Sequence, residues 1–175
     1  FALIKEKLDG VEGREVAFLT GATSGHSSAL LKNYMDALGS AKHYAYEAIT
    51  PSVVRAANKK SYGVEMPRLH IDKARVVVSF GADFLGAWVS PVNFTQQYAK
   101  FRKGSDGIRG VLVQVESKMT LTGANADRWL CIRPGTEGIY ALGLINALGA
   151  KGFKVPAAAA TIANDYTTEL VVQET

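Results

Sequence analysis

Cysteine is nearly missing from this chain, since Cys131 is the only one among 175 residues. A single thiol cannot form a disulfide within the chain, and it cannot build an iron–sulfur cluster or a zinc site, which need several ligands. The three histidines, His26, His43 and His70, lack the spacing of metal ligands, and we interpret them as surface or turn residues. We therefore expect any redox centre, iron–sulfur clusters included, to lie elsewhere in the parent protein.

Long hydrophobic runs and blocks of like charge are missing too. The longest apolar runs, residues 111–115 and 155–160, fall far short of the roughly 20 residues that a transmembrane helix needs, so no direct membrane insertion is expected. The net charge of +4 comes from 20 basic and 16 acidic residues spread along the chain, without the Lys/Arg block of a nucleic-acid-binding arm. With 47% hydrophobic residues, the composition predicts a soluble globular domain without nucleic acid as a partner.

The two ends of the chain predict a piece of a larger protein. Phe1 takes the place of an initiator methionine and opens a helix expected over residues 1–8, while the chain stops at Thr175 within a polar run. We expect residues 1–150 to form one domain and residues 151–175 to form a loop and the start of a following segment. We expect no export signal within such a piece.

Strand-like and helix-like segments alternate along the chain, which is typical of a parallel sheet covered by helices. Apolar patterns predict strands over residues 16–20, 75–80, 110–115 and 126–132. Apolar spacing, together with glycine and proline stops, predicts helices over residues 27–38, 91–103 and 137–148. Residues 151–160 are expected to be a loop and residues 162–172 a short helix. The predicted fold class is α/β, a Rossmann-like parallel sheet with helices on both faces.

Residues 116–137, with the sequence ESKMTLTGANADRWLCIRPGTE, carry the most specific pattern. This segment resembles the nucleotide-binding segment of the molybdopterin oxidoreductase family, where a strand ends in D-P-R-x-T-x-T-x-x-x-A-D-x-W-L-x-I-R-P-G-T-D and holds a guanine dinucleotide of the cofactor. The spacing is kept throughout. Four positions differ, because aspartate, proline, arginine and the last aspartate are replaced by Glu116, Ser117, Lys118 and Glu137.

The resemblance implies cofactor-binding residues at the turns that follow the strands: Gly81, Asp83, Glu116, Lys118, Thr120, Arg133, Gly135, Thr136 and Glu137. A carboxylate such as Glu116 at a strand end can accept both hydrogen bonds of a ribose diol, although the alternative is a solvated side chain. The turn at residues 133–137 leaves backbone N–H groups for a guanine edge or a phosphate, or it simply caps a helix. Asp83 stands where the family commonly has asparagine, so it lacks the amide donor and disfavours an anion, or it caps the next segment.

The family's metal usually takes one side chain from the loop between the first two strands of this region. In members that resemble formate dehydrogenase, Pro-Ser-Val follows that ligand by three residues, and alignment on Pro51, Ser52 and Val53 puts Ala48 at the ligand position. Alanine cannot coordinate a metal, and the nearby oxygen-bearing residues, Glu47 and Ser52, do not match the pattern. We therefore expect no metal ligand and no catalytic residue in this chain.

Two short segments, residues 81–86 and 115–117, are most similar to the large iron–sulfur subunit of alternative complex III, a quinol-oxidising respiratory complex. In that subunit the molybdopterin-type domain persists without molybdenum, and clusters in a separate domain carry the electrons. The resemblance implies a scaffold within an electron-transfer complex. Its partners would be other subunits of a membrane-attached respiratory complex on the periplasmic side of the bacterial inner membrane.

Other functions stay open from the sequence. One is a functional oxidoreductase subunit with two molybdopterin guanine dinucleotides, in which Glu116, Thr136 and Glu137 hold the cofactor. Another is a nucleotide-binding module like the middle domain of thiamine diphosphate enzymes. A short-chain dehydrogenase is disfavoured, because Ser27 replaces the last glycine of the turn at residues 20–27 and no tyrosine has lysine four residues later. The tryptophans, Trp88 and Trp129, are expected to pack the core and helix faces.

Overall fold

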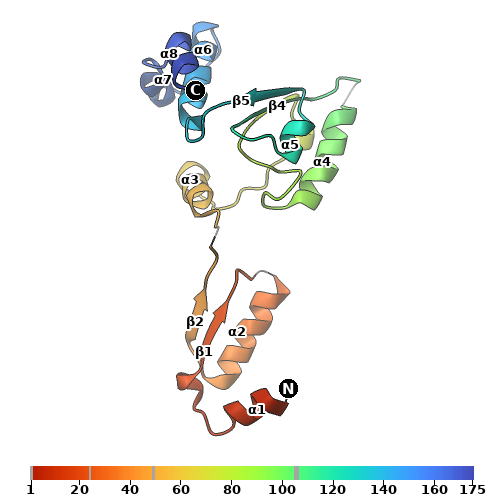
Figure 1. The fold of residues 1–175 in the computed structure, drawn as a ribbon, viewed down its shortest axis with the longest axis vertical. Helices are drawn as coiled ribbons and strands as arrows, with labels where there is room; N and C mark the ends of the chain where they lie inside the picture. Colours follow the sequence, from red (N-terminus) through yellow and green to blue (C-terminus); the bar gives the residue numbers. More distant parts are fainter. Residues whose placement is uncertain (1, 24, 49, 105–106) are drawn as a thin grey trace. The chain divides into compact units, whose positions relative to one another are not determined.

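The computed structural model describes residues 2–23, 25–48, 50–104 and 107–175, and the chain divides into two compact units, Phe1–Pro67 and Arg68–Thr175. Each unit contains a parallel sheet flanked by helices (Figure 1). The predicted α/β class is therefore confirmed. Residues 1–150 as a single domain stay a prediction. Within the described residues, no helix combines the length and the apolar character needed to cross a membrane.

The first unit is built on two short parallel strands. Its elements in order are α1 (Ala2–Leu8), η1 (Gly13–Glu15), β1 (Ala17–Thr20), α2 (His26–Leu38), β2 (Lys42–Ala45) and α3 (Ser52–Tyr62). Phe18 of β1 meets Tyr34 of α2 edge-on, with ring centroids 5.8 Å apart. Gly39 ends α2 with a φ of 71°, a left-handed conformation that suits glycine. Ser40 then returns a hydrogen bond to the Val16 carbonyl at 2.7 Å, which ties the end of the helix to the start of the strand.

The second unit holds a sheet of three parallel strands in the order β3-β4-β5. Its elements are η2 (Ile71–Lys73), β3 (Val76–Phe80), α4 (Pro91–Lys103), β4 (Val111–Glu116), α5 (Leu121–Ala124), β5 (Arg128–Cys131), α6 (Glu137–Ala150), α7 (Ala157–Ala163) and α8 (Thr168–Glu174). The core packs Phe84, Phe94 and Phe101 against Leu112 of the central strand. Because the Phe101 ring lies directly over Gly110, no side chain fits at that position.

Helices α6, α7 and α8 pack together after the last strand, as the blue elements of Figure 1 show. Gly143 of α6 lies against Val171 of α8 so closely that a β-carbon would overlap the valine side chain. The Asn146 amide donates to the Tyr166 carbonyl at 3.0 Å, which secures the turn between α7 and α8. This packing covers part of α6, a helix that is apolar on nearly every side and in which no residue is fully buried.

Two predictions near the end of the chain have wrong bounds. They are the loop over residues 151–160 and the helix over residues 162–172. Helix α7 begins at Ala157, directly after its N-cap Pro156, and α8 begins only at Thr168. Alanine needs no apolar periodicity to favour a helix, so the pattern did not reveal α7. The other predicted strands and helices are confirmed to within a few residues, whereas β2, α3 and α5 were not anticipated.

Candidate functional site

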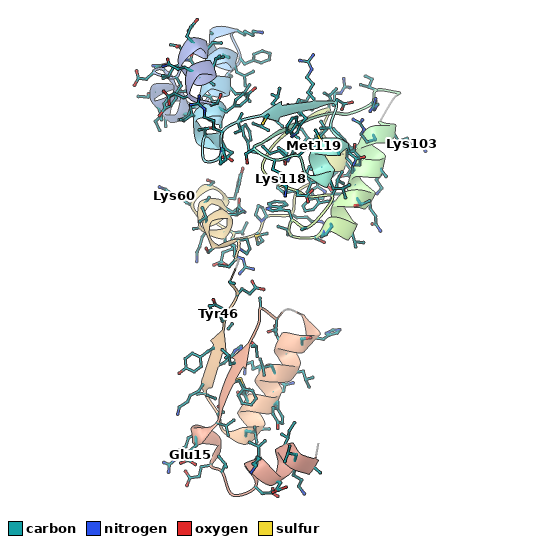
Figure 2. The ribbon with its side chains drawn as sticks, in the orientation of Figure 1. Glu15, Tyr46, Lys60, Lys103, Lys118 and Met119 are labelled. Carbon is teal, nitrogen blue, oxygen red and sulfur yellow. The ribbon has the colours of Figure 1, made fainter. Side chains whose placement is uncertain are left out.

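The carboxyl ends of β3, β4 and β5 lie at one edge of the second sheet, and most of the predicted site residues follow them. The Gly81 amide donates to the Val115 carbonyl at 2.9 Å, and the Ile132 amide donates to the Glu116 carbonyl at 3.3 Å. The three turns therefore start side by side. Figure 2 labels Lys118 in the loop between β4 and α5. This edge is where ligands gather in open parallel sheets, and we call it the carboxyl edge.

The Glu116 carboxylate points into the protein and only 3% of the residue is exposed. One oxygen, Oε1, accepts from the Thr120 amide at 2.8 Å and from the Trp129 indole N–H at 3.2 Å. The other, Oε2, accepts from the Gln114 amide at 2.9 Å, and the Thr120 hydroxyl lies within 3.2 Å of both. Glu116 thus joins β4, β5 and the loop between them, and it is not the solvated side chain that one interpretation expected.

The loop after Glu116 closes onto α5 through Thr120, the N-cap of this short helix. The Thr120 hydroxyl accepts from the Gly123 amide at 3.2 Å, as an N-cap oxygen should. Gly123 lies so close to Glu116 and to the Trp129 ring, whose Cδ1 would be 2.9 Å from a β-carbon, that only glycine fits. A glycine is therefore needed at this position, which the motif leaves open, for the approach of two side chains.

Asp83 fixes the other side of α5. Its Oδ1 accepts from the Thr122 amide at 3.1 Å and from the Thr122 hydroxyl at 2.8 Å. The same hydroxyl accepts from the Leu85 amide at 3.0 Å. The backbone carbonyl of Asp83 also accepts hydrogen bonds from three backbone amides, those of Gly86, Ala87 and Trp88. It therefore links the turn after β3 to α5, a role that differs from capping of the segment that follows it.

Gln114 and Trp129 belong to this network and were not among the predicted site residues. Gln114 is fully buried, donates to Glu116 and to the Ala82 carbonyl, and leaves its Oε1 without a partner among the described residues. The alternation of side chains along a strand places Gln114 on the same face as Glu116, a signal that was available in the sequence. Trp129 was expected only to pack, and its N–H donation to Glu116 depends on tertiary structure.

The turn after β5 has the predicted geometry at the start of α6. Gly135 has a φ of 83°, and the Thr136 amide and hydroxyl both donate to the Arg133 carbonyl, at 3.2 and 2.6 Å. Thr136 is the N-cap but its side chain makes no capping bond, and Glu137 opens the helix. The first amides of α6 are thus left without a side-chain cap.

The carboxyl edge suits an anion better than it suits a ribose. Lys118 and Arg133 are exposed, and neither takes part in an ion pair within the described ranges. By contrast, both oxygens of Glu116 already accept hydrogen bonds from the chain itself, so a ribose diol would have to displace them. In the described part of the chain no group of three or more His, Cys, Asp or Glu residues could hold a metal. The family's cofactor would thus meet cations here, but not the free carboxylate that the resemblance implied.

Comparison with known proteins identifies relatives, although no protein-family model matches the chain. The chain is 26% identical over 145 residues to the molybdopterin-binding-like subunit of menaquinone reductase from Nitratidesulfovibrio vulgaris, which covers 81% of the chain and 21% of that protein. It is 32% identical over 108 residues to a nitrate reductase of Klebsiella oxytoca, with 59% of the chain and 12% of that protein covered.

A third relative and one solved structure agree with these. The molybdopterin-containing subunit of the arsenate respiratory reductase of Chrysiogenes arsenatis is 23% identical over 144 residues, which are 81% of the chain and 16% of that subunit. The structure of acetylene hydratase from Pelobacter acetylenicus matches 98% of the chain and 25% of its own length at a TM-score of 0.61 and 17% identity, which supports the fold. The chain spans between 12% and 21% of the length of these curated relatives. These comparisons support the resemblance of the chain to the molybdopterin oxidoreductase family.

Proposed function

We propose that the chain is a structural domain of a respiratory iron–sulfur protein of this family, that it forms part of an electron-transfer complex, and that it works without bound molybdenum. The parent protein is an oxidoreductase or a subunit of one, with iron–sulfur clusters outside this chain. Its partners are other subunits of a membrane-attached complex on the periplasmic side of the bacterial inner membrane. The chain itself contributes no catalytic residue.

One observation carries this proposal, the inward direction of Glu116. A carboxylate that serves a nucleotide needs a free lone pair toward the ligand, whereas here both oxygens close the loop at residues 117–120. Asp83 adds a second carboxylate that fixes α5 from the other side. The segment that holds a nucleotide in the family is therefore held in place by its own side chains, and the loop needs no ligand to keep its shape.

The relatives and the metal-ligand position support the same proposal. Two of the three relatives are named as subunits of a menaquinone reductase and of an arsenate respiratory reductase, and the first is called molybdopterin-binding-like. Ala48, the residue that aligns with the metal ligand, has no atom that could coordinate molybdenum. The short segments shared with the large subunit of alternative complex III favour that subunit among family members.

A second candidate is a functional subunit with bound molybdopterin guanine dinucleotide. In its favour, the α6 N-terminus has no side-chain cap and lies next to the exposed Arg133, which together suit a phosphate. In that case Gly81, Gly135, Thr136 and Glu137 would hold the cofactor, together with Lys118. The thiamine diphosphate alternative is disfavoured, because one relative is named a molybdopterin-binding-like subunit and another a molybdopterin-containing subunit.

The deciding experiment is elemental and pterin analysis of the full-length protein purified from its native host. Molybdenum, tungsten and iron are measured per polypeptide, and oxidised pterin is measured by its fluorescence. We expect iron without molybdenum, tungsten or pterin. Stoichiometric molybdenum or tungsten together with pterin would overturn the proposal and favour the second candidate.

A further inference from the structure

Basic side chains gather at the opposite edge of the second unit, where its strands begin. Lys73 and Arg75 precede β3, Arg109 precedes β4, and Arg128 opens β5. The last turn of α4 adds three more, Lys100, Arg102 and Lys103. We call this set of seven residues the amino edge.

Backbone contacts bring these segments together. The Gly110 amide donates to the Phe101 carbonyl at 2.9 Å, which places the end of α4 beside the start of β4. The Val111 amide donates to the Arg75 carbonyl at 2.9 Å, which places the start of β3 there as well. Because the strands are parallel and α4 returns in the opposite direction, the basic end of the helix meets the beginnings of the strands. Figure 2 labels Lys103 at this end of α4.

The sequence segments that contribute to the amino edge carry together a net charge equal to that of the whole chain. The acidic residues of these segments are Asp72 and Asp127, joined in the sequence by Asp106, which lies outside the described residues. Seven basic against three acidic residues leave an excess equal to the net charge of +4, so the rest of the chain is balanced. The basic excess is therefore concentrated at one edge, although the sequence showed no run of basic residues.

Asp127 shows how a carboxylate binds to this edge. It contacts Arg102, and its Oδ1 lies 3.1 Å from Arg109 Nη2. By contrast, Lys73, Arg75, Lys100, Lys103 and Arg128 are exposed, and none of them forms an ion pair within the part of the chain that the structure describes. Two exposed apolar residues, Ile108 and Val111, lie among them, with 48% and 41% of their surface accessible.

We infer that the amino edge is a docking surface for an acidic face of a partner protein. Four of its seven basic residues are arginines, whose planar forks bind carboxylates in pairs of hydrogen bonds and which are enriched at protein interfaces. Exposed apolar residues within a charged rim are the usual layout of such an interface. The edge consists of strand starts and a helix end, whereas a lipid surface is usually bound by an amphipathic helix that lies flat.

This surface goes beyond the proposed function and does not depend on it. The amino and carboxyl edges lie at opposite ends of the same three strands, so a docked partner leaves the candidate site open. A molybdenum-containing subunit could use the same surface. A metal analysis that contradicts the proposed function therefore leaves the docking surface untouched, and a negative binding test leaves the proposed function untouched.

The test is binding of a fluorescein-labelled poly-glutamate peptide to the whole chain, followed by fluorescence anisotropy at low salt. The variant K73E/K103E reverses two exposed charges of the amino edge. The matched control K5E/K7E makes the same net change on α1, where Lys5 and Lys7 are exposed. We expect the edge variant to weaken binding about tenfold and the control to stay within about twofold. Added salt should weaken wild-type binding, because exposed charges are screened.

Several outcomes would overturn the inference. Equal weakening by the two variants would mean that only net charge matters, and unchanged binding by the edge variant would mean that the edge is not used. Binding to vesicles that contain phosphatidylglycerol provides a further comparison. If K73E/K103E weakens vesicle binding but leaves peptide binding unchanged, the edge binds a membrane and the inference is wrong. Circular dichroism checks the fold of each variant. If K73E/K103E does not fold, K73Q/K103Q removes the charges without reversing them and should still weaken binding about threefold.

Discussion

The Glu116 carboxylate accepts hydrogen bonds from Gln114, Thr120 and Trp129. Its removal is therefore the most direct test of the carboxyl edge. In E116A, the donors of Gln114, Thr120 and Trp129 lose their acceptor in a buried place. We expect a loss of about 3 kcal/mol in the free energy of unfolding. Urea unfolding followed by circular dichroism measures it. The indole N–H resonance of Trp129 should also shift, which reports directly on the lost bond.

E116Q and an exposed glutamate serve as controls for this prediction. The glutamine keeps the shape of the side chain and one acceptor oxygen, so E116Q should lose less stability than E116A. Glu174 is exposed on α8, and E174A should change the free energy of unfolding by less than about 0.5 kcal/mol. Stability of E116A equal to that of E174A would show that Glu116 is not the anchor of the loop, and would remove the main support for the scaffold function.

Asp127 gives a prediction about acid stability. The Leu112 amide, which donates to Asp127 at 2.8 Å, and the neighbouring Arg102 hold the pKa of this carboxyl below its usual value of about 3.9. A carboxyl whose pKa is lowered by folding stabilises the protein fully above the unfolded pKa, and this contribution is lost as the pH falls through the folded pKa. D127N should therefore lose less stability than wild type between about pH 5 and pH 2.

Urea midpoints at about pH 6 and about pH 3 measure this difference. Asp36 pairs with Lys32 on the exposed face of α2, and D36N serves as the control that keeps the acid sensitivity of wild type. If D127N and D36N lose the same stability in acid, the contacts of Asp127 do not contribute to the pH dependence.

Residue types at the carboxyl edge could be predicted from the sequence, but their directions could not. The motif placed Glu116 at a strand end, and it placed Thr120 and Gly135 in the turns that follow strands, where the structure has them. Whether the Glu116 carboxylate faces a ligand or the protein depends on Trp129 from the next strand and on Gly123 from the next helix. Such contacts arise only when the strands pair, so the sequence offered ribose binding or a solvated side chain for Glu116 and did not reveal that its carboxylate is buried.

At the scale of elements, the packing of α6 on α8 depends on Gly143. A β-carbon at this position would overlap the Val171 side chain, so G143A should cost about 2 kcal/mol despite the better helix propensity of alanine. The double variant G143A/V171A makes room for the new methyl group and should recover part of the loss. Thermal unfolding of wild type, G143A, V171A and G143A/V171A, followed by circular dichroism, measures the coupling.

Gly149 provides the matched control in the same helix. A β-carbon there would lie 3.6 Å from Val155 Cγ2, an ordinary contact, so G149A should leave stability unchanged or raise it by about 0.5 kcal/mol. A G143A variant as stable as G149A would contradict the close packing of α6 on α8.

Elements with a strong periodic signal were predicted well, and short ones were not. Strands β3 and β4 each open on an apolar stretch, residues 76–78 and 111–113, and α4 has Pro91 at its start. In contrast, α5 has four residues and exists because Thr120 and Asp83 bind its first amides. Strand β2 has four residues, all of them exposed, so it shows no apolar pattern and is defined by its pairing with β1.

At the scale of the whole chain, the two units differ in what they bury. The second unit contains the aromatic cluster around Phe101, the buried strand β4 and the packed helices α6 to α8. Among the described residues of the first unit, only Met35 and Ser40 are buried. Since burial of apolar surface is the main source of stability, the second unit should fold without the first.

Two fragments of the chain distinguish an independent second unit from a single domain over residues 1–150. The fragment of residues 68–175 keeps α6 together with α7 and α8, whereas the fragment of residues 1–150 ends at the last residue of α6 and removes the helices that cover it. We expect fragment 68–175 to unfold in one cooperative urea transition, and fragment 1–150 to expose the apolar surface of α6 and bind a hydrophobic dye such as ANS. The opposite result would be cooperative unfolding of fragment 1–150 without dye binding, together with an unfolded fragment 68–175. It would place the domain boundary at residue 150 and would mean that the second unit needs the first in order to fold.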